Sequence, residues 1–406
     1  MAIAVVAAWP AAALEVARDS GGARLEVAGF YKNLLFAVVT PNGQGGATDA
    51  QLLRAGAKYF IEDKFELDVA WQLTFQLASD PAFAGGLSLS RAIGGTGAGP
   101  QRRVVPLGGL IAQTPTSTLV HDVDRLSMKF ALPFGDLTVG RQVLSWGTGR
   151  FFNPTDVLSP FPPTVIDREV RRGFDAVRLA VALGDTTQLD LLWLPQPKPE
   201  DNGGVVRFQT NLLGWDGSLS AGKYVRDFVF GFDLVGDIGP VAVHAEGAYT
   251  VEWLETGGVG EHFFRGVAGA DFRPHEKLLV TAEYSFNGYG TTDPSKYAQV
   301  LTSRRALRGE VFGAGMHVLA VATNFRANDL LSASLSVLCN VTDPSALAFA
   351  AVEYSLTQVV LLRGGAYVPI GRPPAPTEAA SPSRGLRSEY GSSPFGAFAQ
   401  VGIYVP

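Results

Sequence analysis

Residues 64–77, KFELDVAWQLTFQL, alternate between apolar and polar side chains along almost their whole length. In a helix the apolar side chains of this segment would scatter around the axis, whereas in a strand they all point to one side. The segment therefore predicts a long strand with one apolar face and one polar face. The apolar positions are Phe65, Leu67, Val69, Trp71, Leu73, Phe75 and Leu77.

The same alternation recurs along the chain and predicts sixteen strands in a single domain. An alternative count of eighteen arises if residues 212–224 form a hairpin instead of part of a loop. The predicted strands lie at about 24–38, 52–61, 65–77, 119–132, 136–145, 174–183, 187–195, 227–236, 240–252, 264–273, 277–286, 314–325, 330–340, 345–355, 358–368 and 395–405.

The length and spacing of these strands indicate what the apolar face meets. Strands in soluble proteins average about 5–6 residues, whereas a tilted strand needs about 9–11 residues to cross a bilayer. Most of the predicted strands reach the longer range, and short turns alternate with loops of uneven length, such as 39–51, 196–226 and 253–263. An even strand number with this alternation is typical of outer-membrane barrels. The sequence thus predicts an all-β, transmembrane, antiparallel up-and-down β-barrel with short periplasmic turns and long extracellular loops.

The first residues differ in character from the rest. Residues 2–13, AIAVVAAWPAAA, form an apolar run that ends in small residues, and a polar stretch follows. This is the pattern of a signal peptide and its cleavage site, although no Lys or Arg precedes it. We expect residues 1–13 to be a signal peptide truncated at its start, and residues 14–406 to be the barrel.

Composition narrows the function. Charged residues make up 17% of the chain, below the roughly 25% of soluble domains, and the net charge of −5 does not suit nucleic acid. The single cysteine, Cys339, excludes an internal disulfide. None of the five histidines belongs to a zinc motif such as HExxH, and no nucleophile motif occurs. We expect no metal, no cofactor and no enzymatic activity.

One region resembles a known family. Residues 138–160, TVGRQVLSWGTGRFFNPTDVLSP, resemble the porin-like outer-membrane barrels that include alginate-export-type channels and uncharacterised relatives, and the C-terminal segment is similar to their last strand. The resemblance implies an export or diffusion channel without indicating its solute. The residues that carry it are Gly140, Arg141, Gln142, Trp146, Gly147, Asn153, Pro154 and Asp156.

The loop that follows, 146–173, is rich in aromatic residues and proline. We expect it to fold into the barrel mouth, anchored by Trp146, Phe151 and Phe152, although packing on neighbouring loops outside is the alternative. Arg141 lies on the lipid-facing parity of its strand, where a charge near the bilayer midplane costs about 2–4 kcal/mol. Either a bulge turns Arg141 inward or it lies at the rim.

Charged side chains on the polar parity predict the lining of the pore. A basic wall from the first strands would face an acidic wall from the later ones, and arginines at 168–178 would narrow the path. The candidate pore-lining residues are Arg54, Lys58, Arg125, Lys129, Arg141, Arg168, Arg171, Arg172, Arg178, Glu246 and Glu283.

These features favour a passive channel of the Gram-negative outer membrane for small polar or anionic solutes. The partners are the lipid bilayer and a small-molecule solute, and a homo-oligomer or a plug protein stays open. Two alternatives remain. The barrel could be a sheath around a secretion or electron-transfer component, favoured by residues 345–355, SALAFAAVEYS, which are small and apolar on both faces. It could also be a channel for apolar molecules.

Overall fold

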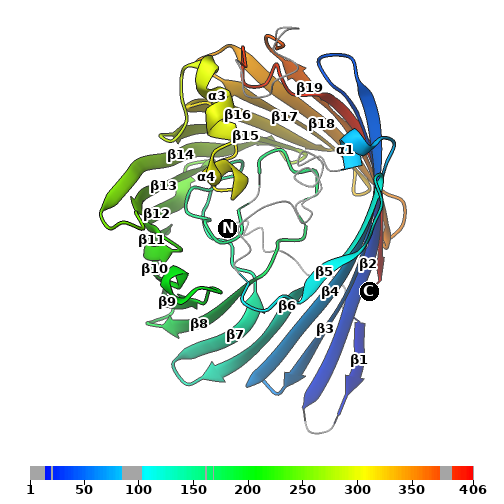
Figure 1. Cartoon of the computed structure of the whole chain (residues 1–406). Helices are drawn as coiled ribbons and strands as arrows, with labels where there is room; N and C mark the ends of the chain where they lie inside the picture. The colour runs from blue at the N-terminus through cyan, green and yellow to red at the C-terminus, as the bar shows by residue number, and fades with distance from the viewer. Residues whose placement is uncertain are drawn as a thin grey trace.

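Eighteen antiparallel strands close into a barrel in the computed structural model (Figure 1). The last strand, β20 (Phe395–Val405), pairs with the first, β2 (Ala23–Val39), and closes it. The strands between them are β3 (Gly45–Ile61), β4 (Phe65–Ala78), β6 (Ser117–Leu132), β7 (Gly135–Gln142), β8 (Phe174–Ala182), β9 (Thr187–Leu194), β10 (Gly203–Leu212), β11 (Trp215–Tyr224), β12 (Asp227–Ile238), β13 (Val241–Trp253), β14 (Val259–His275), β15 (Leu278–Asn287), β16 (His317–Arg326), β17 (Leu331–Asn340), β18 (Ser345–Ser355) and β19 (Val360–Ile370).

The structure describes residues 14–19, 22–84, 103–160, 162–167, 169–374 and 386–405, so the predicted signal peptide lies outside the described residues. Two short strands, β1 (Leu14–Arg18) and β5 (Gly108–Gln113), add to the edges of β2 and β6. The helical segments are α1 (Pro81–Ala84), η1 (Pro199–Asp201), η2 (Pro294–Lys296), α3 (Tyr297–Leu301) and α4 (Arg304–Leu307). Within the described ranges, none of these helices has the length and apolar character needed to span a membrane.

The predicted alternation determines which side chains face outward. Along β12, Phe228, Phe230 and Phe232 are exposed on the outside of the barrel, while the residues between them are buried. A soluble sandwich would bury such an apolar face against a second sheet, whereas here it surrounds the barrel. Because an apolar exterior on a closed sheet suits lipid and leaves no unpaired edge, the predicted transmembrane β-barrel fold is confirmed.

The strand count of sixteen is wrong, and the alternative of eighteen is right. The predicted loop 196–226 contains β10 and β11, which pair directly with each other. Their two-residue turn, Leu213-Gly214, has positive φ angles of 54° and 84°, as hairpin turns of this length prefer. Short polar and glycine-rich stretches concealed the alternation in both strands.

Two predicted loops are also shorter than expected. β3 begins at Gly45 and not near residue 52, and β14 begins at Val259 and not near 264. Small and polar residues open both strands, so they lack the alternation. Pairing with long neighbours extends them, since β2 and β3 pair without interruption from Val39↔Gly45 to Ala23↔Ile61.

Connections alternate between the two ends of the barrel. At one end of the barrel each connection has two to four residues, as at 62–64 and 239–240, and we call this the short-turn end. The other, the long-loop end, carries the long segments 79–116, 143–173, 288–316 and 371–394, together with shorter ones. The described residues of 143–173, here the inner loop, lie inside the barrel, as the teal and green trace in Figure 1 shows.

Candidate functional site

The inner loop enters the barrel through a tight backbone approach at Gly147. This residue has a φ of +98°, a conformation that side chains rarely adopt. A Cβ atom there would lie 2.6 Å from a carboxylate oxygen of Glu246 on β13. Only glycine lets the backbone pass this close to the barrel wall, so Gly147 directs the loop inward.

Glu246 binds the first part of the inner loop. Its carboxylate accepts hydrogen bonds from the backbone N–H groups of Thr148 (2.7 Å), Gly149 (3.2 Å) and Thr155 (2.8 Å), and from the Thr155 hydroxyl (2.9 Å). The side chain is only 1% exposed. A buried carboxylate needs such charge-assisted hydrogen bonds to offset the loss of its hydration.

Glu283 on β15 binds the next turn of the same segment. It accepts hydrogen bonds from the backbone N–H groups of Arg150 (2.6 Å), Phe151 (3.2 Å) and Phe152 (2.9 Å), and its Oε2 lies 3.1 Å from Nε2 of His244. Together the two glutamates accept six backbone N–H groups of the inner loop. Hydrogen bonds to charged groups contribute about 1.5–3 kcal/mol each, so this attachment is strong.

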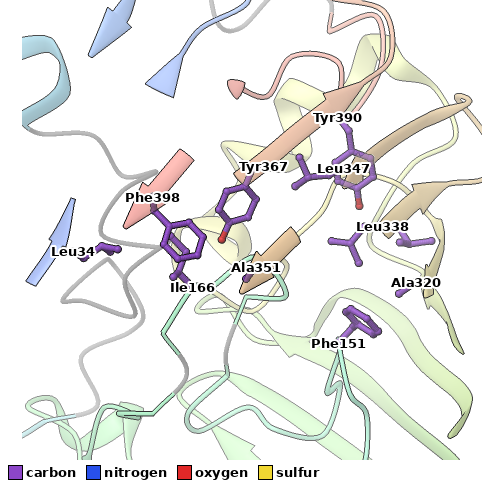
Figure 2. Packing of buried hydrophobic residues seen from close by; sticks show 11 residues of the cluster. Leu34, Phe151, Ile166, Ala320, Leu338, Leu347, Ala351, Tyr367, Tyr390 and Phe398 are labelled. Carbon is purple, nitrogen blue, oxygen red and sulfur yellow. The ribbon is translucent and has the colours of Figure 1, made fainter. Parts of the chain in front are cut away.

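The three predicted anchor residues lie where the inner loop contacts the wall. Trp146 is buried with residues of β8 to β13, whereas Phe151 packs against β16 and β17. Figure 2 shows Phe151 near Leu338 and Ala320, and Ile166 of the same loop beside Phe398. Phe152 is partly buried and packs against the same apolar cluster as Phe151. The inner loop thus spans the interior between two apolar patches of the wall.

The far arm of the inner loop is bound to β2, β19 and β20. Lys32 on β2 forms an ion pair with Asp167 at 2.6 Å and a second with Glu169. Arg363 and Tyr367 on β19 donate to the carbonyl oxygens of Ile166 and Thr164 at 2.6 and 2.7 Å. Burial acts to raise the pKa of Asp167, but the charge and hydrogen bond of Lys32 outweigh burial, so that the pKa is lowered.

The loop's central acid, Asp156, pairs with Arg171. Nη1 of Arg171, which carries two hydrogens, donates to a carboxylate oxygen of Asp156 and to the carbonyl oxygen of Ser159, the latter at 2.8 Å. Burial raises the pKa of Asp156, and the positive charge of Arg171 opposes this rise. Arg171, predicted to face the water path, therefore cross-links two parts of the inner loop, and its side chain is 14% exposed.

Arg141 departs from the prediction that it lines the pore. Its side chain is 2% exposed and forms an ion pair with Asp175 at 2.8 Å. It also donates to the carbonyl oxygens of Val123 and Val105. The preceding residue, Gly140, has a φ of +118°, a backbone conformation that residues other than glycine rarely adopt. Arg141 thus lies within the wall and joins strands β6 and β8 to the segment before β5.

Most other cations of the predicted basic wall are also paired with nearby acids. Arg54 and Arg125 both bind Asp124, each at 2.7 Å, and Arg125 also donates to the carbonyl oxygen of Arg171 at 3.1 Å. The remaining pairs are Lys58–Glu66 at 3.0 Å, Lys129–Asp136 at 2.9 Å and Arg178–Asp190 at 2.6 Å. The predicted separation into a basic and an acidic wall is therefore wrong, because acids and bases interleave.

Two predicted arginines differ from this pattern. Arg172 has no ion pair among the described residues, and its buried Nε lacks a hydrogen-bond partner there. Burial and the neighbouring Arg103 lower the pKa of Arg172. Arg168 lies outside the described residues. Within the part of the chain that the structure describes, no group of three or more His, Cys, Asp or Glu side chains could hold a metal ion.

Open space remains on both sides of the inner loop. A cavity of about 740 Å³ lies toward the short-turn end and is lined by β11 to β19 and by the loop, with charged groups that include Arg150, Asp271 and Arg363. A second cavity, of about 80 Å³, lies between the inner loop and the segment 288–316. Pro163 and Thr164 of the loop and Leu338 of β17 line both cavities.

Comparisons with known proteins identify solved structures with a similar fold. The barrel is similar to the crystal structures of Pseudomonas aeruginosa OccK5 (OpdH), Acinetobacter baumannii OccAB2 and Pseudomonas aeruginosa OpdQ, with TM-scores of 0.57, 0.57 and 0.56. Sequence identity is 10%, 9% and 9%, and each alignment covers 94% of this chain and 98% of the other. No family model and no curated protein matches the sequence.

These likenesses, at such low identity, concern the fold. They agree with the apolar exterior and the closed sheet, and together these features confirm the predicted transmembrane β-barrel fold. The resemblance to alginate-export-type channels stays a prediction. Sequence reasoning placed Glu246 and Glu283 in the lumen, but it had no signal that their partners would be backbone N–H groups of a loop about one hundred residues away.

Proposed function

We propose that this protein is a passive channel of the Gram-negative outer membrane, through which small polar solutes, anions included, diffuse past the inner loop. The long-loop end would face the exterior and the short-turn end the periplasm, as in barrels of this type. The observation that carries the proposal is the pair of cavities on opposite sides of the inner loop. Because Pro163, Thr164 and Leu338 line both, the narrowest point of the path would lie between them.

The sheath alternative is less well supported. It depended on residues 345–355, now β18, which are small and apolar on both faces and offered a surface for a plug, a partner or a neighbouring barrel. Leu347 and Ala351 on its inner face belong to the same buried cluster as Phe151 and Ile166 of the inner loop. The chain's own loop therefore packs against part of this inner face, while Leu347 and Phe349 also line the larger cavity.

Single-channel recording of the purified protein in a planar bilayer tests the proposal. We expect discrete ohmic steps, because open space lies on both sides of the loop. A correctly folded barrel that produces no steps over a range of voltages would contradict passive conduction.

Shortening Leu338 should widen the proposed constriction. Leu338→Ala removes a side chain that lines both cavities, so we expect a larger single-channel conductance. The matched control is Leu319→Ala, on the outer side of the neighbouring strand β16, where the side chain is 41% exposed and lines neither cavity. Equal conductance in Leu338→Ala and the wild type, with both barrels intact, would place the constriction elsewhere.

Arg363 should contribute to charge selectivity. Arg363 lines the larger cavity, and its one ion pair among the described residues is a long contact of 3.9 Å between its Nε and Glu353. We expect Arg363→Gln to shift the reversal potential under a salt gradient toward cation preference. Lys64→Gln, which removes a cation from an exposed short turn, should leave the potential unchanged. A shift of equal size in both variants would argue against a local effect.

A further inference from the structure

Four aromatic side chains form a stripe on the inner face of β18, β19, β20 and β2. They are Phe349, Tyr367, Phe398 and Phe36, and we call them the aromatic stripe. Register pairs join Phe349 to Tyr367 and Phe398 to Phe36. The ring centroids of Phe349 and Tyr367 lie 4.6 Å apart, and those of Tyr367 and Phe398 lie 6.4 Å apart. The interior of a membrane barrel is usually polar, so this stripe requires an explanation.

Two glycines let the aromatic stripe lie flat against the wall. A Cβ atom at Gly365 would lie 2.6 Å from the Phe398 ring, and one at Gly396 would lie 2.9 Å from the Phe36 ring. Both distances are shorter than real Cβ contacts, so a side chain at either position would push the ring toward the lumen. The rings therefore lie along the sheet instead of filling the lumen.

The inner loop covers only part of the aromatic stripe. Ile166 of the loop packs beside Phe398, as Figure 2 shows. Phe349, by contrast, stays partly exposed, and together with Tyr367 and Leu347 it lines the cavity of about 740 Å³. This volume lies within the range of about 300–1,000 Å³ that is usual for small-molecule sites, which are mostly apolar with a few polar groups. An apolar surface thus remains open to a solute at this end of the stripe.

Hydroxyl and amide groups lie next to the open end of the stripe. Ser336 of β17 is the register partner of Phe349, and Ser334 of β17 is the register partner of Asn324 on β16. All of them line the cavity, and among the described residues the side chains of Ser334, Ser336 and Asn324 form no hydrogen bond with protein. Each therefore keeps donors and acceptors for a solute. A ring that lay on Phe349 would bring polar substituents at one of its edges to these groups.

The charges around the cavity are balanced. Among the described residues, three arginines and three aspartates line it, and Arg150 and Asp271 form an ion pair at 2.7 Å. The other four are Arg273, Arg363, Asp216 and Asp237. Because these formal charges sum to zero, the cavity as a whole favours neither an anion nor a cation.

We propose that this end of the cavity, here the ring site, binds a neutral aromatic ring that carries hydroxyl groups along one edge, as in a small phenol. The ring would lie against Phe349 and Tyr367, since aromatic pairs are stable in offset or tilted arrangements. Its hydroxyl groups would bond to Ser334, Ser336 and Asn324. A sugar suits the site less well, because its hydroxyl groups surround the whole ring and some would meet the apolar wall. This inference rests on the proposed channel function and adds a solute class to it.

Equilibrium dialysis of radiolabelled resorcinol against the full chain in lipid nanodiscs tests the proposal, with empty nanodiscs of the same lipid to subtract partition into the bilayer. We expect saturable binding to the protein, tighter than that of myo-inositol or benzoate. Phe349→Leu should weaken binding about 2- to 12-fold, because it removes the ring but keeps an apolar side chain. Ser336→Ala removes one hydroxyl group and should weaken binding about 2- to 12-fold.

The matched control is Phe230→Leu on the outer face of β12, where the side chain is 53% exposed and lines neither cavity. It should leave binding unchanged, and heat-dependent gel mobility should show a closed barrel in every variant. Equal binding of resorcinol to the wild type, Phe349→Leu and Ser336→Ala would overturn the proposal. So would tighter binding of myo-inositol or benzoate, or no binding above that of empty nanodiscs.

These outcomes are separate from those of the conduction test, because dialysis measures no current. Discrete current steps without resorcinol binding would overturn the ring site and leave the channel function in place. Saturable binding that is weakened in Phe349→Leu, without current steps, would support the ring site and contradict passive conduction.

Discussion

Replacing Glu246 and Glu283 together by glutamine should release the inner loop and raise the single-channel conductance, with steps that fluctuate more than those of the wild type. The two carboxylates accept six backbone N–H groups of the loop. Glutamine keeps the shape of glutamate but loses the charge and presents N–H donors to some of these N–H groups. Each hydrogen bond to a charged group contributes about 1.5–3 kcal/mol, so the combined loss should outweigh the remaining contacts.

The matched control is Glu276→Gln, on an exposed turn at the short-turn end. It removes the same charge without touching the loop, and we expect wild-type conductance. Heat-dependent mobility in gel electrophoresis would verify that each barrel is closed. An intact double variant that conducts as the wild type does would mean that the attachment to these glutamates does not limit the pore.

Val337→Arg should prevent assembly of the barrel. Val337 lies on the outer face of β17, between Val321 of β16 and Ala348 of β18, where lipid surrounds the barrel. A lipid-facing arginine near the bilayer midplane costs about 2–4 kcal/mol, a large part of the stability of a typical domain. We expect loss of the folded, heat-modifiable form in outer-membrane preparations.

Ser336→Arg provides the comparison on the neighbouring position. Ser336 faces the opposite way and lines the larger cavity, where water can solvate the charge. This variant should assemble normally and change only conduction. If both variants assembled equally well, the assignment of inner and outer faces on β17 would be wrong.

The charged residues show where sequence reasoning failed. Arg54, Arg125 and Arg178 do point away from lipid, as their parity predicts. Asp124 lies on the same strand as Arg125 but two strands away from Arg54, across β4, and Asp190 lies on the strand next to that of Arg178. Alternation gives only the side of the sheet that a residue faces. It does not give the register between strands, which decides whether a cation meets an acid or water.

The error in the predicted number of strands has a similar cause. The hairpin of β10 and β11 contains glycines and polar residues that weaken the alternation, so the sequence left sixteen and eighteen strands open. Pairing of β9 with β10 and of β11 with β12 along nearly their whole length determined the outcome. The backbone groups of a membrane barrel must all be paired, so even weakly patterned strands are retained in the sheet.

The sequence by itself determined that this chain forms a membrane β-barrel. An alternation with a period of two places the apolar side chains on one face of a strand, and the length of the strands matches the thickness of a bilayer. The sequence also identified residues 146–173 as too apolar for an exposed loop. Only the tertiary structure decided where that loop binds. Its backbone N–H groups carry no sequence signature, and the glutamates that accept them, Glu246 and Glu283, become neighbours of the loop only when the barrel closes around it.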